Sequence, residues 1–82
     1  MATPQETIAS FVLGRFRSAI GRNALRPDEP LVSSGIIDSF GLLELIAWLE
    51  DTFRVTIDPG QHEISEFETV NDIAALVERV RR

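Results

Sequence analysis

The chain has 82 residues, a net charge of −5 at pH 7, one histidine and no cysteine. A chain this short builds one modest core, so we expect a single domain over residues 1–82. The missing cysteines exclude disulfides, thiolate metal sites and a cysteine nucleophile, and one histidine cannot make a His-rich metal site.

Hydropathy and the N-terminal segment indicate where the protein resides. No apolar run approaches the ~20 residues that a membrane span needs. The N-terminus lacks the basic start of a signal peptide. We therefore expect a soluble, cytoplasmic protein without a membrane span.

The acidic residues are concentrated in the middle of the chain, where positions 28–72 hold 11 acids and a single base, Arg54. The other basic residues, which are also all arginine, lie toward the two ends. An acidic segment repels nucleic acid and attracts basic protein surfaces, although an ordinary solvated surface has the same composition. We expect protein partners and no nucleic acid.

The first predicted helix starts at Pro4 and stops at Gly21. Thr3 can cap it, and Glu6 can complete a capping box with Thr3. Apolar residues then recur at helical spacing: Ile8, Phe11, Val12, Phe16, Ala19 and Ile20. A glycine is a common C-terminal stop, which is the role expected of Gly21.

A long connection follows over residues 22–38, where Pro27 and Pro30 break any helix. A connection of this length in so small a domain has to pack against the core. Its apolar residues are the expected anchors: Leu25, Leu31, Val32, Ile36 and Ile37. Gly35 is placed for a tight turn.

The second predicted helix runs from Ser39 to about Phe53, with Asp38 as its N-cap. Its core stripe consists of Leu42, Leu45, Ile46, Leu49 and Phe53. A second apolar group lies off that stripe, flanked by acids: Phe40, Leu43 and Ala47 beside Glu44, Glu50 and Asp51, with Trp48 off the stripe as well. Either the long connection folds over this group, or the group forms a docking surface for a partner with an apolar groove and a basic rim.

The rest of the chain is also predicted to be helical. Residues 54–59 leave the second helix in an extended path, and a short helical turn is expected around residues 63–67. The last helix starts after its cap, Thr69, with Asp72 in its first turn. Its inward face is formed by Val70, Ile73, Ala74, Val77 and Val80. The predicted fold is all-α, a small four-helix bundle with three main helices, one short helix and a long first loop.

Ser39 is the first residue of the second helix, where the positive end of the helix dipole favours phosphate. A catalytic serine would need a base oriented by a third group. The only candidate base is His62, which is expected to be exposed in a polar loop. We therefore predict no catalytic residue and no metal site. Ser39 is either an ordinary helix residue or an attachment point that another enzyme modifies.

The tripeptide Asp38-Ser39-Phe40, which follows Gly35 and opens an acidic amphipathic helix, resembles the phosphopantetheine attachment motif of acyl and peptidyl carrier proteins. The likeness covers nearly the whole chain and includes "DEPLVSSGIIDSF", "LLELIAWLEDTF", "RVTIDP" and "FETVNDIAALV". In fatty-acid synthesis carriers, Gly usually stands three residues before the serine and Leu follows it. The segment "SGIIDSFG" looks closer to free-standing carriers of specialised pathways, including the D-alanyl carriers that serve cell-wall teichoic acids.

The resemblance implies a role for each matching residue. Ser39 would carry 4′-phosphopantetheine, donated by coenzyme A, through a phosphodiester, and the thiol of that arm would hold the cargo as a thioester. Asp38 matches the acid of the motif. The partner-binding positions would be Phe40, Leu43, Glu44, Ala47, Glu50 and Asp51.

The resemblance also implies partners and leaves the cargo open. The partners would be a phosphopantetheinyl transferase, an adenylating ligase or acyltransferase, and downstream acyl-accepting enzymes, all acting on a monomer that is not itself an enzyme. The cargo would be acyl or aminoacyl, including D-alanyl or peptidyl, in fatty-acid, polyketide or nonribosomal peptide biosynthesis. A competing hypothesis is a helical interaction module that has kept the fold and lost the arm. An enzyme ranks last, because the chain lacks a base and a metal site.

Overall fold

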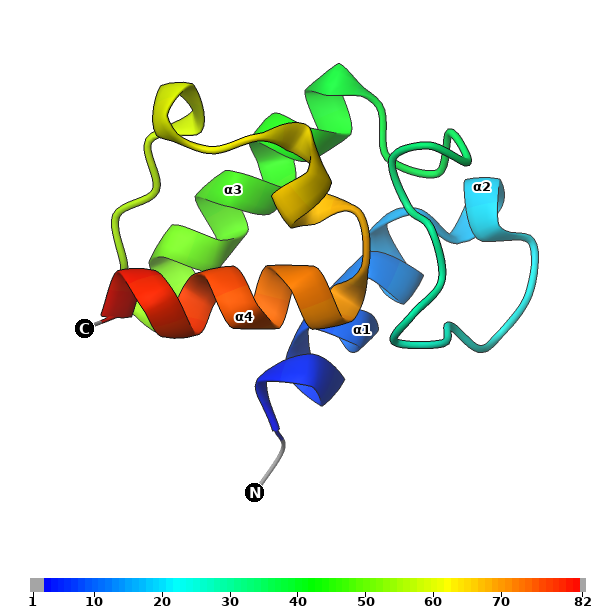
Figure 1. The fold of residues 1–82 in the computed structure, drawn as a ribbon. Helices are drawn as coiled ribbons and strands as arrows, with labels where there is room; N and C mark the ends of the chain where they lie inside the picture. The colour runs from blue at the N-terminus through cyan, green and yellow to red at the C-terminus, as the bar shows by residue number, and fades with distance from the viewer. Residues whose placement is uncertain (1–2, 82) are drawn as a thin grey trace.

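The structure is a computed structural model that describes residues 3–81. Its helices are α1 (Pro4–Arg15), α2 (Arg17–Ile20), α3 (Ser39–Phe53) and α4 (Val70–Arg81), with two short 3-10 helices, η1 (Pro59–Gln61) and η2 (Ile64–Phe67) (Figure 1). The described residues contain no strand, which confirms the predicted all-α bundle with a long first loop.

The first helix begins as predicted but ends early. The Thr3 hydroxyl accepts a hydrogen bond from the Glu6 backbone N–H at 3.1 Å, and the Glu6 carboxylate accepts one from the Thr3 N–H at 3.0 Å, which completes the capping box. The prediction of one helix up to Gly21 is wrong, because the backbone leaves helical geometry at Phe16 (φ −111°, ψ 29°). The short helix α2 follows, and Gly21 ends it at φ 72° in the left-handed region that favours glycine.

The break at Phe16 coincides with a close contact between helices. The Phe16 ring lies over Gly41 in α3, where an added Cβ would stand only 2.6 Å from Cε1 of the ring. Because Gly41 has no side chain, the Phe16 ring can occupy this space. Ala19, which the helical spacing grouped with the other apolar residues of this helix, is exposed.

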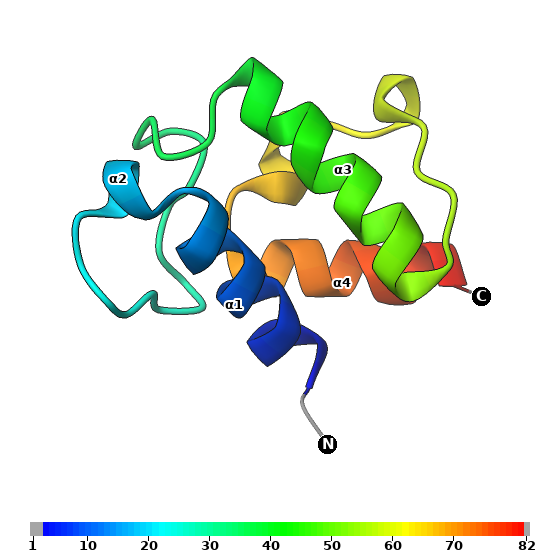
Figure 2. The same ribbon diagram turned by 180° about the vertical axis from the view of Figure 1, so that it is seen from behind.

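The core gathers side chains from the helices and from both connections between them. Its buried members are Ile8, Val12, Leu31, Ile37, Leu45, Ile46, Leu49, Ile57, Phe67, Val70, Ile73, Ala74, Leu76 and Val77. Leu76 was absent from the predicted inward face. The buried face of α4 is wider than expected, because α4 contacts both α1 and η2 (Figures 1 and 2).

The core stripe of α3 matches its predicted periodicity, with Leu45, Ile46 and Leu49 buried and the flanking Leu42 and Phe53 half-buried. Trp48, predicted to fall off that stripe, is also half-buried. Its ring stacks on Phe11 of α1 at a centroid distance of 4.2 Å and an interplanar angle of 11°. Helix α3 therefore packs on a second side as well, where α1 supplies an aromatic partner.

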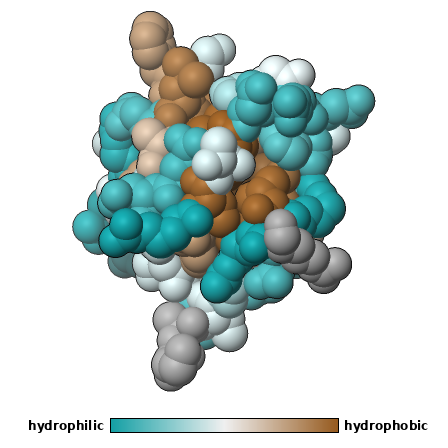
Figure 3. Space-filling view, turned by 90° about the vertical axis from the view of Figure 1, so that its left-hand side faces the viewer, coloured by the Kyte–Doolittle hydropathy of each residue, from teal (hydrophilic) through white to brown (hydrophobic). Residues whose placement is uncertain are grey.

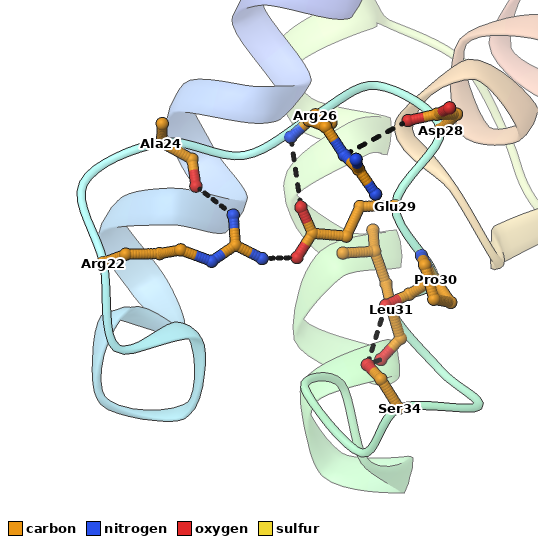
Figure 4. A network of polar contacts seen from close by, with 8 residues as sticks. All are labelled: Arg22, Ala24, Arg26, Asp28, Glu29, Pro30, Leu31 and Ser34. Carbon is orange, nitrogen blue, oxygen red and sulfur yellow. Dashed lines mark hydrogen bonds and ion pairs between the residues drawn. The ribbon is translucent and has the colours of Figure 1, made fainter.

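The long loop packs as predicted and contains an unexpected buried acid. Glu29 is buried, forms an ion pair with Arg22 and accepts a hydrogen bond from the backbone N–H of Arg26 at 3.3 Å (Figure 4). A buried carboxylate needs such partners, since an unpaired charge in the interior is costly. The expected anchors all contact the core: Leu31 and Ile37 are buried, and Leu25, Val32 and Ile36 are half-buried.

Apolar side chains also reach the surface at the end of the bundle where the C-terminus lies. The space-filling view of that side shows them framed by hydrophilic residues (Figure 3). Half-buried Phe53, Val55 and Val80 pack against the core from the last turns of α3 and α4 and from the segment after α3. Within residues 3–81, no helix is long and apolar enough to cross a membrane.

Candidate functional site

The N-terminus of α3 is built by Asp38. Its carboxylate accepts a hydrogen bond from the backbone N–H of Gly41 at 2.7 Å, which satisfies one of the free donors of the first helical turn. The cap confirms the predicted start of the helix and makes Ser39 its first residue. Ser39 is exposed to solvent and lies at the positive end of a 15-residue helix.

The segment before Asp38 is held by a residue far away in the sequence. One carboxylate oxygen of Glu68, just before α4, accepts hydrogen bonds from the backbone N–H groups of Leu31, Val32 and Ser33 at 3.2, 2.8 and 3.0 Å. Hydrogen bonds from Ser33, chiefly the one from its backbone N–H, lower the pKa of Glu68 below its usual value. Desolvation acts in the opposite direction but is the weaker effect. Glu68 thereby positions the loop whose end presents Ser39.

We expect Glu68→Gln to lower the melting temperature by about 4–8 °C at pH 7, the shift that a loss of about 1 kcal/mol gives in a domain of this size. Because the pKa of Glu68 is lower in the folded protein, its contribution is complete above the unfolded pKa of about 4.3 and is lost as pH falls through the folded value. Urea unfolding of both proteins between pH 7 and pH 3 measures the difference.

The matched control is Glu78→Gln, because Glu78 is an exposed acid on α4. Its variant should stay close to the wild-type protein at every pH. A gap between wild type and Glu68→Gln that keeps its size down to pH 3 would contradict a role for the ionised carboxylate.

An exposed apolar surface adjoins Ser39. Phe40 is 79% exposed and Leu43 is 58% exposed. Ala47, one turn further along α3, is exposed as well. The alternative that the long loop folds over this group is therefore wrong, because the loop packs beside the start of α3 and leaves these side chains open to solvent.

The three acids near this surface differ in their surroundings. Glu44 forms a two-point ion pair with Arg15 at the end of α1, at 2.5 and 2.8 Å. Glu50 is half-buried and accepts a hydrogen bond from the backbone N–H of Ile57 at 2.9 Å, across the turn that ends α3. Asp51 is exposed.

Two open hollows flank the start of α3. The larger, about 390 Å³, lies on the side of α2, and its walls include Phe16, Ala19, Ile36, Phe40 and Gly41. The other, about 280 Å³, is lined by Ser39 itself together with Val32, Ile37, Leu42 and Ile64. Ile64 of η2 is 60% exposed. Ser39 therefore stands at the edge of a small apolar hollow.

His62 is not exposed as predicted. Its ring is half-buried, and Nδ1 lies 3.4 Å from the Glu66 carboxylate, which also pairs with Arg79 of α4. The polar residues next to His62 in the sequence did not indicate this contact with Glu66. Among residues 3–81, no group of three His, Asp or Glu side chains is arranged to hold a metal ion.

The long-range contacts of Arg15 and Glu68 were not predicted. Arg15 reaches an acid 29 positions away, and Glu68 reaches backbone groups 35 to 37 positions away. Neither residue has a local pattern that indicates its partner, because these contacts exist only after the helices have packed.

Comparison with known proteins identifies relatives along most of the chain. A family model described as "Phosphopantetheine attachment site" matches residues 10–77. The chain is 30% identical over 73 residues to a D-alanyl carrier protein of Streptococcus suis (strain 98HAH33), with 89% of each chain covered. It is 35% identical over 54 residues to a D-alanyl carrier protein of Streptococcus pyogenes serotype M5 (strain Manfredo), with 66% of this chain and 68% of the relative covered.

Proposed function

This chain belongs to the family of carrier proteins that bind 4′-phosphopantetheine, and we propose that Ser39 is the residue to which this arm is attached. A phosphodiester would join the arm to the oxygen of the Ser39 hydroxyl. When bound, the arm supplies the thiol on which a carrier holds its cargo as a thioester. The chain itself then needs no cysteine and no catalytic group.

One observation carries this assignment: Ser39 is an exposed hydroxyl at the first position of α3. The helix end is rigid because Asp38 caps it and Glu68 restrains the loop before it. The N-terminal end of a helix also favours the negative charge of a phosphodiester. A flexible arm attached to Ser39 would have a structured attachment point next to an exposed apolar surface.

Intact mass spectrometry after incubation with coenzyme A and a phosphopantetheinyl transferase tests the assignment. We expect the mass to rise by one phosphopantetheine, and fragmentation to place the gain on Ser39. A gain on another residue, or none after prolonged incubation, would contradict the proposal.

We propose an aminoacyl cargo, D-alanine, loaded by an adenylating ligase with ATP. The support is that the similar streptococcal proteins are D-alanyl carrier proteins. Holo protein incubated with such a ligase, ATP and D-alanine should gain one alanyl group that hydroxylamine removes. Loading by an acyltransferase and an acyl-coenzyme A, with none by the ligase, would favour an acyl cargo instead.

The proposed attachment and loading reactions indicate where the protein works and which enzymes it meets. Coenzyme A and ATP are cytoplasmic reagents, so we place the carrier in the cytoplasm as a monomer that meets its transferase, its ligase and a downstream acceptor enzyme in turn. The chain performs no catalysis itself in this scheme. Weak and fast association suits a protein that has to leave each partner after one transfer.

We further propose that partners contact one surface of α3, which we call the docking face. It consists of Phe40, Leu43, Glu44, Ala47, Glu50 and Asp51. The support is the large exposed apolar area next to Ser39, since apolar surface of this kind on a small protein marks an interaction site.

Two substitutions on the docking face should slow loading by the transferase in different ways. Leu43→Ala should lower kcat/KM up to about tenfold with little salt dependence, because it removes apolar contact area. Asp51→Arg should lower kcat/KM several-fold at low salt, and the effect should shrink as salt rises, because exposed charges are screened over ~8–10 Å. Loading rates at low and high salt measure both effects. Both side chains are exposed, so the melting temperature should change little. A Leu43→Ala protein that melts early but loads normally would mean that Leu43 serves the fold.

A further inference from the structure

The acid of the docking face closest to Ser39 in the sequence is already paired within the molecule. The Arg15 guanidinium donates two hydrogen bonds to the Glu44 carboxylate, Nε to Oε2 at 2.8 Å and Nη2 to Oε1 at 2.5 Å. The Arg15 guanidinium also stands over the Phe16 ring, 5.5 Å from its centre. A two-point pair of this kind has one defined geometry.

The pair changes what an approaching protein meets at this position. The two charges cancel locally, and both side chains remain about half exposed, at 49% and 46%. A lysine or arginine of a partner that approached Glu44 would also approach the Arg15 guanidinium and be repelled by it. The docking face is therefore close to neutral around Glu44, although the sequence of α3 is acidic there.

The space beside the pair has a mixed lining. The 390 Å³ hollow on the side of α2 is lined by charged side chains, those of Arg15, Asp38 and Glu44, and by apolar ones, those of Phe16, Ile36 and Phe40. Gly41, which has no side chain, allows the Phe16 ring to lie against α3 in the lining of this hollow.

We propose that Arg15 is a specificity-determining residue of the docking face. By neutralising Glu44, it selects a partner enzyme that packs an apolar group against the exposed Phe40 and carries no cation opposite Glu44. Specificity often depends on an element that repels the wrong partner, and here the Arg15 guanidinium has that function. This inference rests on the proposed function of Ser39 and the docking face.

The test uses four forms of the full chain: wild type, Arg15→Gln, Glu44→Gln and the double variant. The probe is a phosphopantetheinyl transferase with a basic carrier-binding surface, supplied with coenzyme A at low and at physiological salt. We expect Arg15→Gln to raise kcat/KM about threefold to tenfold at low salt, because it exposes the Glu44 charge. Glu44→Gln should lower kcat/KM by a similar factor, because it leaves the Arg15 charge unpaired.

The double variant decides between the two explanations for Glu44. If Arg15 neutralises Glu44, the double variant is again locally neutral, and its kcat/KM should return to within about twofold of wild type. If Glu44 instead contacts a cation of the partner directly, the double variant will be as slow as Glu44→Gln, and the proposal is overturned. Raising the salt concentration should make the kcat/KM values of all four proteins similar, because salt screens the charges.

Two further measurements exclude other causes. Arg81→Gln removes the same charge at the C-terminal end of α4, away from the start of α3 in both ribbon views (Figures 1 and 2), and should change the rate by less than about twofold. A gain equal to that of Arg15→Gln would attribute the effect to net charge and overturn the proposal.

The intact mass after complete reaction separates the failure of the Ser39 assignment from the failure of the inference on Arg15. If no form gains the arm, the assignment of Ser39 fails. If every form gains it and the double variant stays slow, only the inference on Arg15 fails.

Discussion

Ser39→Ala should abolish the gain of phosphopantetheine, because the proposed phosphodiester needs the oxygen of the Ser39 hydroxyl. The loss should be complete within the sensitivity of intact mass spectrometry, whereas a change at the docking face should only slow the reaction. The fold should persist, since Ser39 is exposed and alanine is compatible with a helix. The melting curve of the variant should therefore overlay that of the wild-type protein.

Other serines provide matched controls for this experiment. Ser33, Ser34 and Ser65 are exposed like Ser39, and their alanine variants should gain the arm. The Ser34 hydroxyl donates a hydrogen bond to the Pro30 carbonyl oxygen at 2.7 Å, and Ser34→Ala removes it. This variant therefore also tests whether the loop before α3 tolerates the loss of one hydrogen bond. Phosphopantetheine found on Ser39→Ala at any of these positions would refute the assignment.

Leu49→Ala should have the largest effect on stability, a loss of roughly 2–5 kcal/mol of unfolding free energy. Leu49 is fully buried in the middle of α3, and truncating a buried leucine loses both its transfer free energy and the packing around the cavity left behind. Domains of this kind have a total stability of only about 5–15 kcal/mol, so this one change could leave a large unfolded fraction. The melting temperature should fall by roughly 10–30 °C.

The same helix offers the control. Leu43→Ala removes the same atoms from a side chain that is 58% exposed, so it should cost much less stability than Leu49→Ala. Urea unfolding followed by the fluorescence of Trp48, the only tryptophan, measures both variants, because its ring is stacked on α1. Equal losses for the two leucines would mean that the buried and exposed faces of α3 have been assigned the wrong way round.

Local sequence signals were sufficient to predict where α1 and α3 begin. Asp38 and Thr3 have side chains that cap a helix by accepting a hydrogen bond from the backbone N–H three residues away, and both caps are present. The 3.6-residue spacing of Leu45, Ile46 and Leu49 also predicted which side of α3 is buried. Such signals depend on neighbours in the chain and need no knowledge of the fold. The resemblance to carrier proteins, which rests on the same segment, led to the correct family.

The sequence also limited the alternatives for the exposed group on α3 to two without deciding between them. Phe40 and Leu43 had to be either covered by the long loop or open to a partner. The structure leaves them open, because Leu31 and Ile37 anchor the loop in the core and Glu68 holds it beside α3. That outcome depends on how residues far apart in the chain pack, which the spacing of apolar residues cannot specify.

The sequence by itself determined where α1, α3 and α4 begin, the caps at those ends and the face of α3 that forms the core, because these follow from bonds and periodicity within a few residues. Only the tertiary structure decided that α1 breaks at Phe16, that Trp48 packs on Phe11 and that Glu44 is paired with Arg15. Each of these features joins α1 to α3, so it arises only when the two helices come together. The charge that the docking face presents is therefore a property of the packed bundle and not of the α3 sequence alone.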